Sequence, residues 1–154
     1  MSQVEARLAE HGSVVPEVAI PVAAYIPAVR TGNLIFTSGQ LPFASGELLA
    51  VGHVGDVVDE ATAAAAARQC ALNAIAAIKS VIGDLDKVVR VVKVVGFVAS
   101  ATGFTKQPVV INGASELLAQ AFGDAGVHAR SAVGVAELPL NASVEVEVIV
   151  EVKD

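Results

Sequence analysis

The final segment of the chain places the strongest constraint on its fold. Residues 143–152 read SVEVEVIVEV, so a valine stands at almost every second position. A period of two is typical of a β-strand with one buried face, because successive side chains of a strand point to opposite sides of the sheet. The other face carries Glu145, Glu147 and Glu151, with Ile149 among them. We therefore expect a sheet with one valine-lined, buried side and one side that presents carboxylates.

Two stretches have the spacing of amphipathic helices. The first begins after Asp59, a residue suited to the N-cap, and ends near Ile82, before Gly83. The second is predicted over residues 112–122. Helical spacing defines the buried face of each helix. These faces comprise Leu72, Ile75, Ile78 and Ile82 in the first helix, and Ala114, Leu117, Leu118 and Ala121 in the second.

The remaining predicted strands have valine-rich or alternating sequences bounded by turn residues. They cover residues 34–38, a short piece near 47–51, the valine run of 87–100, and residues 131–138. A connection of hairpin length joins the last of these to the final strand. Arg90 and Lys93 break the alternation of the valine run and predict a bulge there. The order of elements favours an α+β fold, with two main helices packed on one face of a mixed β-sheet.

Residues 1–21 form an extension to this core. Residues 3–10 predict a short helix, and residues 13–28, with three prolines, predict an extended chain. The length fits a single domain, 1–154, with its core at 22–152. No apolar run approaches the roughly 20 residues that a membrane span needs, and the charged first residues do not resemble a signal peptide. We expect a cytoplasmic protein with no membrane partner.

Composition narrows the classes of partner. Hydrophobic residues make up 54% of the chain and charged residues 17%, so we expect a homo-oligomer in which a neighbouring subunit covers the second face of the sheet. The net charge of −6, without a basic cluster, argues against a nucleic-acid partner. No His/Cys spacing predicts a metal site, and no phosphate loop is present. The single cysteine, Cys70, is predicted to be a buried apolar residue rather than a reactive thiol.

Several motifs follow one another in an order that resembles a known family. They are RTGNLIFTSGQLP (30–42), the long helix, the valine-rich strand, NGASELL (112–118) and ARSAVGVAELPLNASVEVEVI (129–149). Over residues 22–152 the chain is similar to the Rid family, the RidA/YjgF-type reactive-intermediate imine deaminases. The most specific elements are Arg-Ser-x-Val followed by Leu-Pro, and the SGQ-x-P segment.

The resemblance implies a chorismate-mutase-like α+β fold and a homotrimer with clefts for a small-molecule carboxylate between neighbouring subunits. It also implies a hydrolase, an imine deaminase that needs no cofactor. Its substrates would be small enamine or imine carboxylates of the 2-aminoacrylate type, and its products would be 2-keto acids and ammonia.

Arg130 and Glu145 carry the chemistry that the resemblance implies. Arg130 matches the family's substrate-binding arginine, and a guanidinium grips a carboxylate through two charge-assisted hydrogen bonds. The alternative is a structural salt bridge to Glu145 or Glu147. Glu145 matches a glutamate that positions or activates the attacking water, which it does best if partial burial raises its pKa. The alternative is a solvated sheet face, which we expect for Glu151 and leave open for Glu147.

Further site candidates each have a structural alternative. Gly39, beside Ser38, matches a position where the backbone approaches the substrate carboxylate, although a plain turn glycine is an equal interpretation. Tyr25 matches a tyrosine at the cleft edge or is a packed aromatic residue. Asn112 matches a cleft-lining asparagine or is the N-cap of the second helix. His128 is interpreted as a surface residue, and its position two residues before Arg130 leaves open the alternative that it faces the same cleft.

Some residues depart from the family pattern. Tyr25 lies in Ala-Ala-Tyr-Ile-Pro where the family has Gly-Pro-Tyr-Ser, and Ala132 stands where many members have Cys or Thr. The loop SATGFTKQPVV and the first helix are extra relative to the short deaminases. We therefore expect a divergent, longer subgroup. The first hypothesis is an imine deaminase, and the alternative is a non-catalytic carboxylate-binding trimer, a sensor or sequestering protein. Nuclease activity is the least favoured at this net charge.

Overall fold

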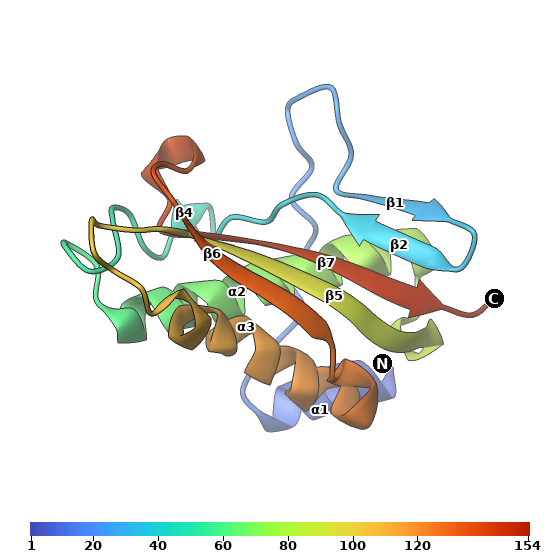
Figure 1. Cartoon of the computed structure of the whole chain (residues 1–154). Helices are drawn as coiled ribbons and strands as arrows, with labels where there is room; N and C mark the ends of the chain where they lie inside the picture. The colour runs from blue at the N-terminus through green and yellow to red at the C-terminus, as the bar shows by residue number, and fades with distance from the viewer.

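A five-stranded mixed sheet forms the centre of the computed structural model, which describes all residues, 1–154 (Figure 1). The strands lie in the order β1-β2-β7-β5-β6. Strands β5 and β6 are parallel, and the other neighbours are antiparallel. The bounds are β1 (Ala28–Thr31), β2 (Leu34–Thr37), β5 (Val88–Ala99), β6 (Ala129–Val135) and β7 (Val144–Val152), and β3 (Phe43–Ala44) pairs with β4 (Glu47–Leu48) in a separate hairpin.

Two long helices, α2 (Glu60–Ile82) and α3 (Gln107–Phe122), pack on one face of this sheet, as the sequence predicts (Figure 1). The Asp59 carboxylate caps α2 by accepting a hydrogen bond from Thr62 N at 2.7 Å, and Gly83 follows the last turn. The predicted inner residues of both helices are all buried. None of the helices has the length and apolar character needed to span a lipid bilayer.

Strand β7 confirms the period of two in its sequence. Its five valines are buried against the helices, and the four residues between them are only half-buried. Strand β5 lies between β7 and β6, and its register with β7 shifts between Val88 and Arg90 and again between Val91 and Lys93. These shifts confirm the predicted bulge.

The other face of the sheet has no helix on it (Figure 1). The strand register places Val29, Phe36 and Val133 on this face, and they are 52%, 37% and 44% exposed. Large apolar side chains exposed together on one surface are typical of a surface that another protein covers. This is the face that the sequence predicts a neighbouring subunit to cover.

Three features differ from the sequence-based expectation. Helix α3 begins at Gln107, before the expected start, because Pro108 occupies its first turn, where a missing N–H costs no hydrogen bond. The chain preceding the Gly32-Asn33 turn was expected to be merely extended but forms strand β1 and pairs with β2. Strands β6 and β7 do not form a hairpin, because β5 lies between them. Connections η1 (Leu85–Lys87), η2 (Gly123–Gly126) and η3 (Pro139–Asn141) are short 3-10 turns.

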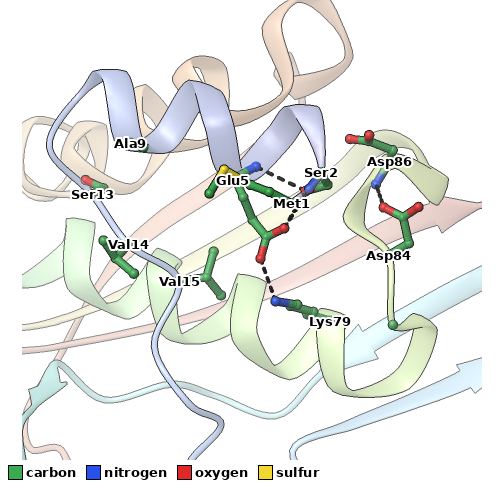
Figure 2. A pocket seen from close by; sticks show the side chains of 11 residues that line it. Met1, Ser2, Glu5, Ala9, Ser13, Val14, Val15, Lys79, Asp84 and Asp86 are labelled. Atoms are coloured by element: carbon green, nitrogen blue, oxygen red, sulfur yellow. Dashed lines mark hydrogen bonds and ion pairs between the residues drawn. The ribbon is translucent and has the colours of Figure 1, made fainter.

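Helix α1 (Gln3–Glu10) has the predicted bounds and packs on the outside of the helical layer, against α3 and η1 (Figure 1). Ser2 and Glu5 form a capping box, and the Asp86 carboxylate accepts hydrogen bonds from the first two backbone N–H groups of the helix (2.9 and 3.2 Å). Figure 2 shows that Glu5 also reaches Lys79 on α2, beside a cavity of about 520 Å³. The extension is therefore fixed to the helices rather than to the sheet.

Candidate functional site

Arg130 lies on the edge strand β6, and its side chain reaches α3. Its Nη1 donates hydrogen bonds to Asn112 Oδ1 (2.8 Å) and to Ser115 Oγ (3.2 Å), and its Nη2 donates to the carbonyl of Pro108 (3.3 Å). Arg130 is in no ion pair within 4.0 Å. The alternative of a structural salt bridge to a β7 carboxylate is therefore wrong.

The hydrogen bonds of Arg130 leave part of its guanidinium available. This group has five N–H donors in one plane. Three of them point to acceptors on α3, which leaves the Nε donor and one Nη2 donor. Nε and Nη2 share one edge of the guanidinium plane, and a carboxylate accepts two parallel hydrogen bonds from such an edge. Asn112 and Arg130, which we call the arginine group, thus form one half of the predicted site.

Glu145 lies on β7, on the face of the sheet without helices. Its side chain is half-buried. Burial raises the pKa of the Glu145 carboxyl above its ordinary value, and the negative charge of Glu147 raises the pKa further. A raised pKa makes a carboxylate a stronger base, which suits it to accept a proton from water and return it.

Gly39 contacts the Glu145 carboxyl directly. A β-carbon at position 39 would lie only 1.9 Å from Glu145 Oε1, which is closer than two non-bonded atoms can approach. The backbone at Gly39 does not have a positive φ, so turn geometry does not require glycine here. The close approach of Glu145 accounts for the glycine instead.

A cavity of about 440 Å³ has both Gly39 and Tyr25 in its wall, although Glu145 does not line it. Ser38 Oγ donates a hydrogen bond to the carbonyl of Ile26 at 2.6 Å and so fixes the segment that carries the tyrosine. Tyr25 itself is 57% exposed and is not a packed core aromatic. Glu145, Gly39, Ser38 and Tyr25, which we call the glutamate group, form the other half of the predicted site.

The arginine group and the glutamate group lie on opposite faces of the sheet. Arg130 is in register with Val94, which is fully buried beneath the helices, whereas Glu145 is in register with Phe97 on the other side of the same strand. Residues paired in register point to the same side of a sheet. One copy of the chain therefore holds the two groups apart.

Comparison with known proteins identifies the fold. A family model described as "YjgF/chorismate mutase-like, putative endoribonuclease" matches residues 5–152. The chain belongs to this family. The match includes most of α1 and both halves of the predicted site.

Solved structures of other YjgF-type proteins resemble the chain along most of its length. Protein Atu1372 of Agrobacterium tumefaciens, described as of unknown function, is 49% identical with a TM-score of 0.90, and the match covers 97% of this chain and 91% of that one. A putative endoribonuclease of Shewanella oneidensis is 34% identical with a TM-score of 0.93, covering 97% and 99%. TdcF of Escherichia coli, solved with bound serine, is 25% identical with a TM-score of 0.60, covering 90% and 94%.

Two further residues extend the arginine group: Ser115, which contacts Arg130, and His128, which contacts Ser115. Ser115 Oγ lies 3.0 Å from His128 Nε2, and His128 Nδ1 lies 2.6 Å from the carbonyl of Gly126. The surface interpretation of His128 is therefore wrong, because the side chain is half-buried and hydrogen-bonded at both ring nitrogens. The spacing of Asn112 and Ser115 held a signal, because positions three apart share a helix face.

Two other sequence interpretations can be compared with the structure. Asn112 lies inside α3, so the N-cap interpretation is wrong, and Lys106 precedes the first turn instead. Cys70 is fully buried, and burial raises the pKa of its thiol well above the ordinary value, with a smaller contribution from the charge of Glu145. This agrees with an inert, apolar role. Nowhere do three His, Cys, Asp or Glu side chains come together in an arrangement that could bind a metal ion.

Proposed function

We propose that this YjgF-family protein is a hydrolytic deaminase of small enamine and imine carboxylates, acting as a homotrimer with its sites between subunits. The observation that carries the proposal is the pair of half-sites. Two N–H donors of the Arg130 guanidinium have no partner within the chain and can bind an anion. Glu145 is a half-buried carboxyl with a raised pKa. Hydrolysis of an imino acid requires one group that binds the substrate carboxylate and one group that transfers a proton.

In the proposed mechanism, Arg130 and the backbone at Gly39 bind the substrate carboxylate. Glu145 accepts a proton from a water molecule as its oxygen attacks the imine carbon. Glu145 returns this proton to the nitrogen, which gives an amino alcohol. The hydroxyl proton of the amino alcohol then passes to the nitrogen by way of Glu145, the C–N bond breaks with its electron pair leaving on ammonia, and the C=O bond of the 2-keto acid forms. Orientation supplies much of the acceleration, since such substrates already tend to hydrolyse in water.

A second copy of the chain is needed because Arg130 and Glu145 point away from opposite faces of the sheet. The helix-free face offers an apolar surface for this contact, with Phe36 and Val133 partly exposed. In the proposed trimer, the arginine group of one subunit lies opposite the glutamate group of the next. TdcF, a family member solved with bound serine, supports a ligand of amino-acid size.

The test couples the purified protein to a serine or threonine dehydratase and follows keto-acid formation. We expect the wild type to accelerate this step, and Arg130→Met and Glu145→Gln to lose the acceleration. Glu151→Gln, on the same face of β7, is the matched control and should behave as the wild type. No acceleration by the wild type with either dehydratase would refute the proposal.

The same variants test the alternative functions. Pyruvate binding that persists in Glu145→Gln, without acceleration by the wild type, would indicate the non-catalytic binding trimer. The family description includes a putative endoribonuclease. RNA cleavage that Arg130→Met or Glu145→Gln abolishes would assign that activity to this site, although a chain with a net charge of −6 has no electrostatic advantage in binding RNA.

A further inference from the structure

A chain of hydrogen bonds connects His128 to Arg130 through Ser115. His128 Nδ1 lies 2.6 Å from the carbonyl of Gly126, and His128 Nε2 lies 3.0 Å from Ser115 Oγ. The same Ser115 oxygen accepts a hydrogen bond from Arg130 Nη1 at 3.2 Å. The three side chains come from different segments, the η2–β6 junction, α3 and β6. They are held together by these contacts rather than by adjacency in sequence.

The acceptors fix the direction of each hydrogen bond. A carbonyl oxygen only accepts, so the proton of the neutral imidazole of His128 is on Nδ1. Nε2 of His128 then has a lone pair and accepts from the hydroxyl of Ser115. The Ser115 hydroxyl has only one proton to give, so its oxygen is left as an acceptor for Arg130. The neutral histidine thereby orients the serine oxygen toward the guanidinium.

This orientation fixes the plane of the Arg130 side chain. Asn112 and Ser115 are the acceptors of the two Nη1 donors, and they lie three residues apart on the same face of α3. Two acceptors on one nitrogen and a third on Nη2 define the plane of the group. The edge of the guanidinium that carries Nε and Nη2 is then held in one orientation, whereas an unrestrained arginine side chain can adopt many.

Arg130 is the only permanently charged side chain in the network. The charged residues on the surrounding elements are Arg90 and Lys93 on β5, Glu116 on α3 and Asp124 in η2. None of them lies within 4.0 Å of His128 or Arg130 as an ion pair. The guanidinium is therefore positioned by neutral acceptors, and its charge stays available for an anion.

We propose that Ser115 and His128 are positioning residues that preorganise Arg130 for the carboxylate of the substrate. This inference rests on the proposed function, in which Arg130 binds that carboxylate. Neither residue contacts the reacting atoms. Their removal should therefore weaken binding of the carboxylate and raise KM, while kcat of the bound substrate changes little.

The test measures pyruvate affinity by calorimetry and KM and kcat in the dehydratase-coupled assay. Ser115→Ala and His128→Phe should weaken pyruvate binding and raise KM by about three- to tenfold, the range expected for one lost hydrogen bond. Ser115→Thr keeps the hydroxyl and His128→Gln keeps an acceptor near Nε2, so both should stay within about twofold of the wild type. Ser80→Ala removes a hydroxyl that donates to the carbonyl of Ala77 on α2, and is the matched control.

The outcomes separate this inference from the proposed function. Wild-type pyruvate binding that Arg130→Met abolishes, but that Ser115→Ala and His128→Phe leave unchanged, would overturn the positioning role alone. Equal losses in the alanine and threonine variants of Ser115 would also overturn it, because the hydroxyl would not be the cause. A wild type that neither binds pyruvate nor accelerates imine hydrolysis would overturn the proposed function, and the positioning role with it.

Discussion

At the scale of single residues, the space beside Gly39 in the candidate site is taken up by the Glu145 side chain. The glycine is present because a carboxylate oxygen occupies the space that any β-carbon would take. The atom in the way is the end of a flexible side chain, so a larger residue would displace the carboxylate rather than the backbone. A substitution at position 39 is therefore expected to change the position of the Glu145 carboxylate and to have a smaller effect on folding.

Gly39→Ala should retain the fold and lose most of the activity. A displacement of the catalytic carboxylate by about 1 Å can reduce the rate by about 10²-fold. We expect the midpoint of thermal unfolding to change by only a few degrees, as measured by circular dichroism. An alanine variant that deaminates at the wild-type rate would show that the position of the carboxylate does not matter.

The raised pKa of Glu145 predicts two pH effects. Activity should fall on acidification at a higher pH than an ordinary glutamate would give, because the base must be ionised. Glu147→Gln removes a neighbouring negative charge and lowers the pKa of Glu145, so the acidic limb of the kcat/KM profile should move to lower pH. An unchanged limb in Glu147→Gln would assign the profile to another group.

The raised pKa of Glu145 should make its contribution to the stability of the folded state larger at low pH than at high pH, whereas activity is expected to fall at low pH. A carboxyl whose pKa is raised by folding favours the folded state while it is protonated, and this contribution is lost as the pH rises through the folded-state pKa. Glu145→Gln should thus unfold at a higher temperature than the wild type at pH 7, and the difference should shrink at low pH.

At the scale of elements, helix α1 is attached to the core by side chains that the alternation and helix patterns do not reveal. Glu5 accepts hydrogen bonds from Lys79 and from Ser2, and these contacts lower its pKa from 4.5 to about 2. Asp86, in the turn after α2, accepts from the first N–H groups of α1. The N-terminal extension is therefore an integral part of the helical layer.

Glu5→Gln should lower the midpoint of thermal unfolding at pH 7, since the carboxylate contributes to both the capping box and the ion pair. A folded-state pKa below the unfolded value gives stability that is present above about pH 4.5 and lost as the pH falls toward 2. The difference from the wild type should accordingly narrow over this range in melting curves. Glu10→Gln, exposed at the end of the same helix, should show no such pH-dependent difference.

Sequence periodicity predicted the elements better than it predicted their pairing. The valines of β7 and the inner stripes of α2 and α3 were identified because burial imposes a repeat on one chain segment. A repeat gives the buried face but not the neighbouring strand, so the insertion of β5 between β6 and β7 could not be predicted. The start of α3 was missed because Pro108 is a helix breaker everywhere except the first turn.

The candidate site was predicted in its parts and not in its arrangement. Arg130, Glu145 and Gly39 were named from motifs, whereas their separation onto two faces follows from strand register, which the sequence does not specify. Ser115 was not named, and His128 was expected on the surface with a cleft-facing position as the alternative. Their contact joins residues 13 positions apart across two segments, which a periodic pattern within one segment does not reveal.

At the scale of the whole molecule, the separation of the two half-sites makes a prediction about mixing. Arg130→Met and Glu145→Gln should each be inactive alone, yet a mixture refolded together should recover activity. In a cyclic trimer, a mixed assembly holds one site with both wild-type residues, so a random equimolar mixture should regain about a quarter of the wild-type rate. Light scattering should confirm that the refolded mixture has the mass of a trimer. No recovery of activity in such a mixture would mean that each site draws both residues from one chain.

The two-faced arrangement also has a consequence for how the activity depends on abundance. Under the proposed function, a chain that carries Arg130 and Glu145 on opposite faces of its sheet has no complete reaction centre in isolation. Its turnover per chain should therefore decline on dilution, once the concentration falls below that at which the copies separate. In a cell, the concentration of the protein would then determine the number of complete sites. It would also determine the fraction of chains that are assembled into oligomers and can contribute to such a site.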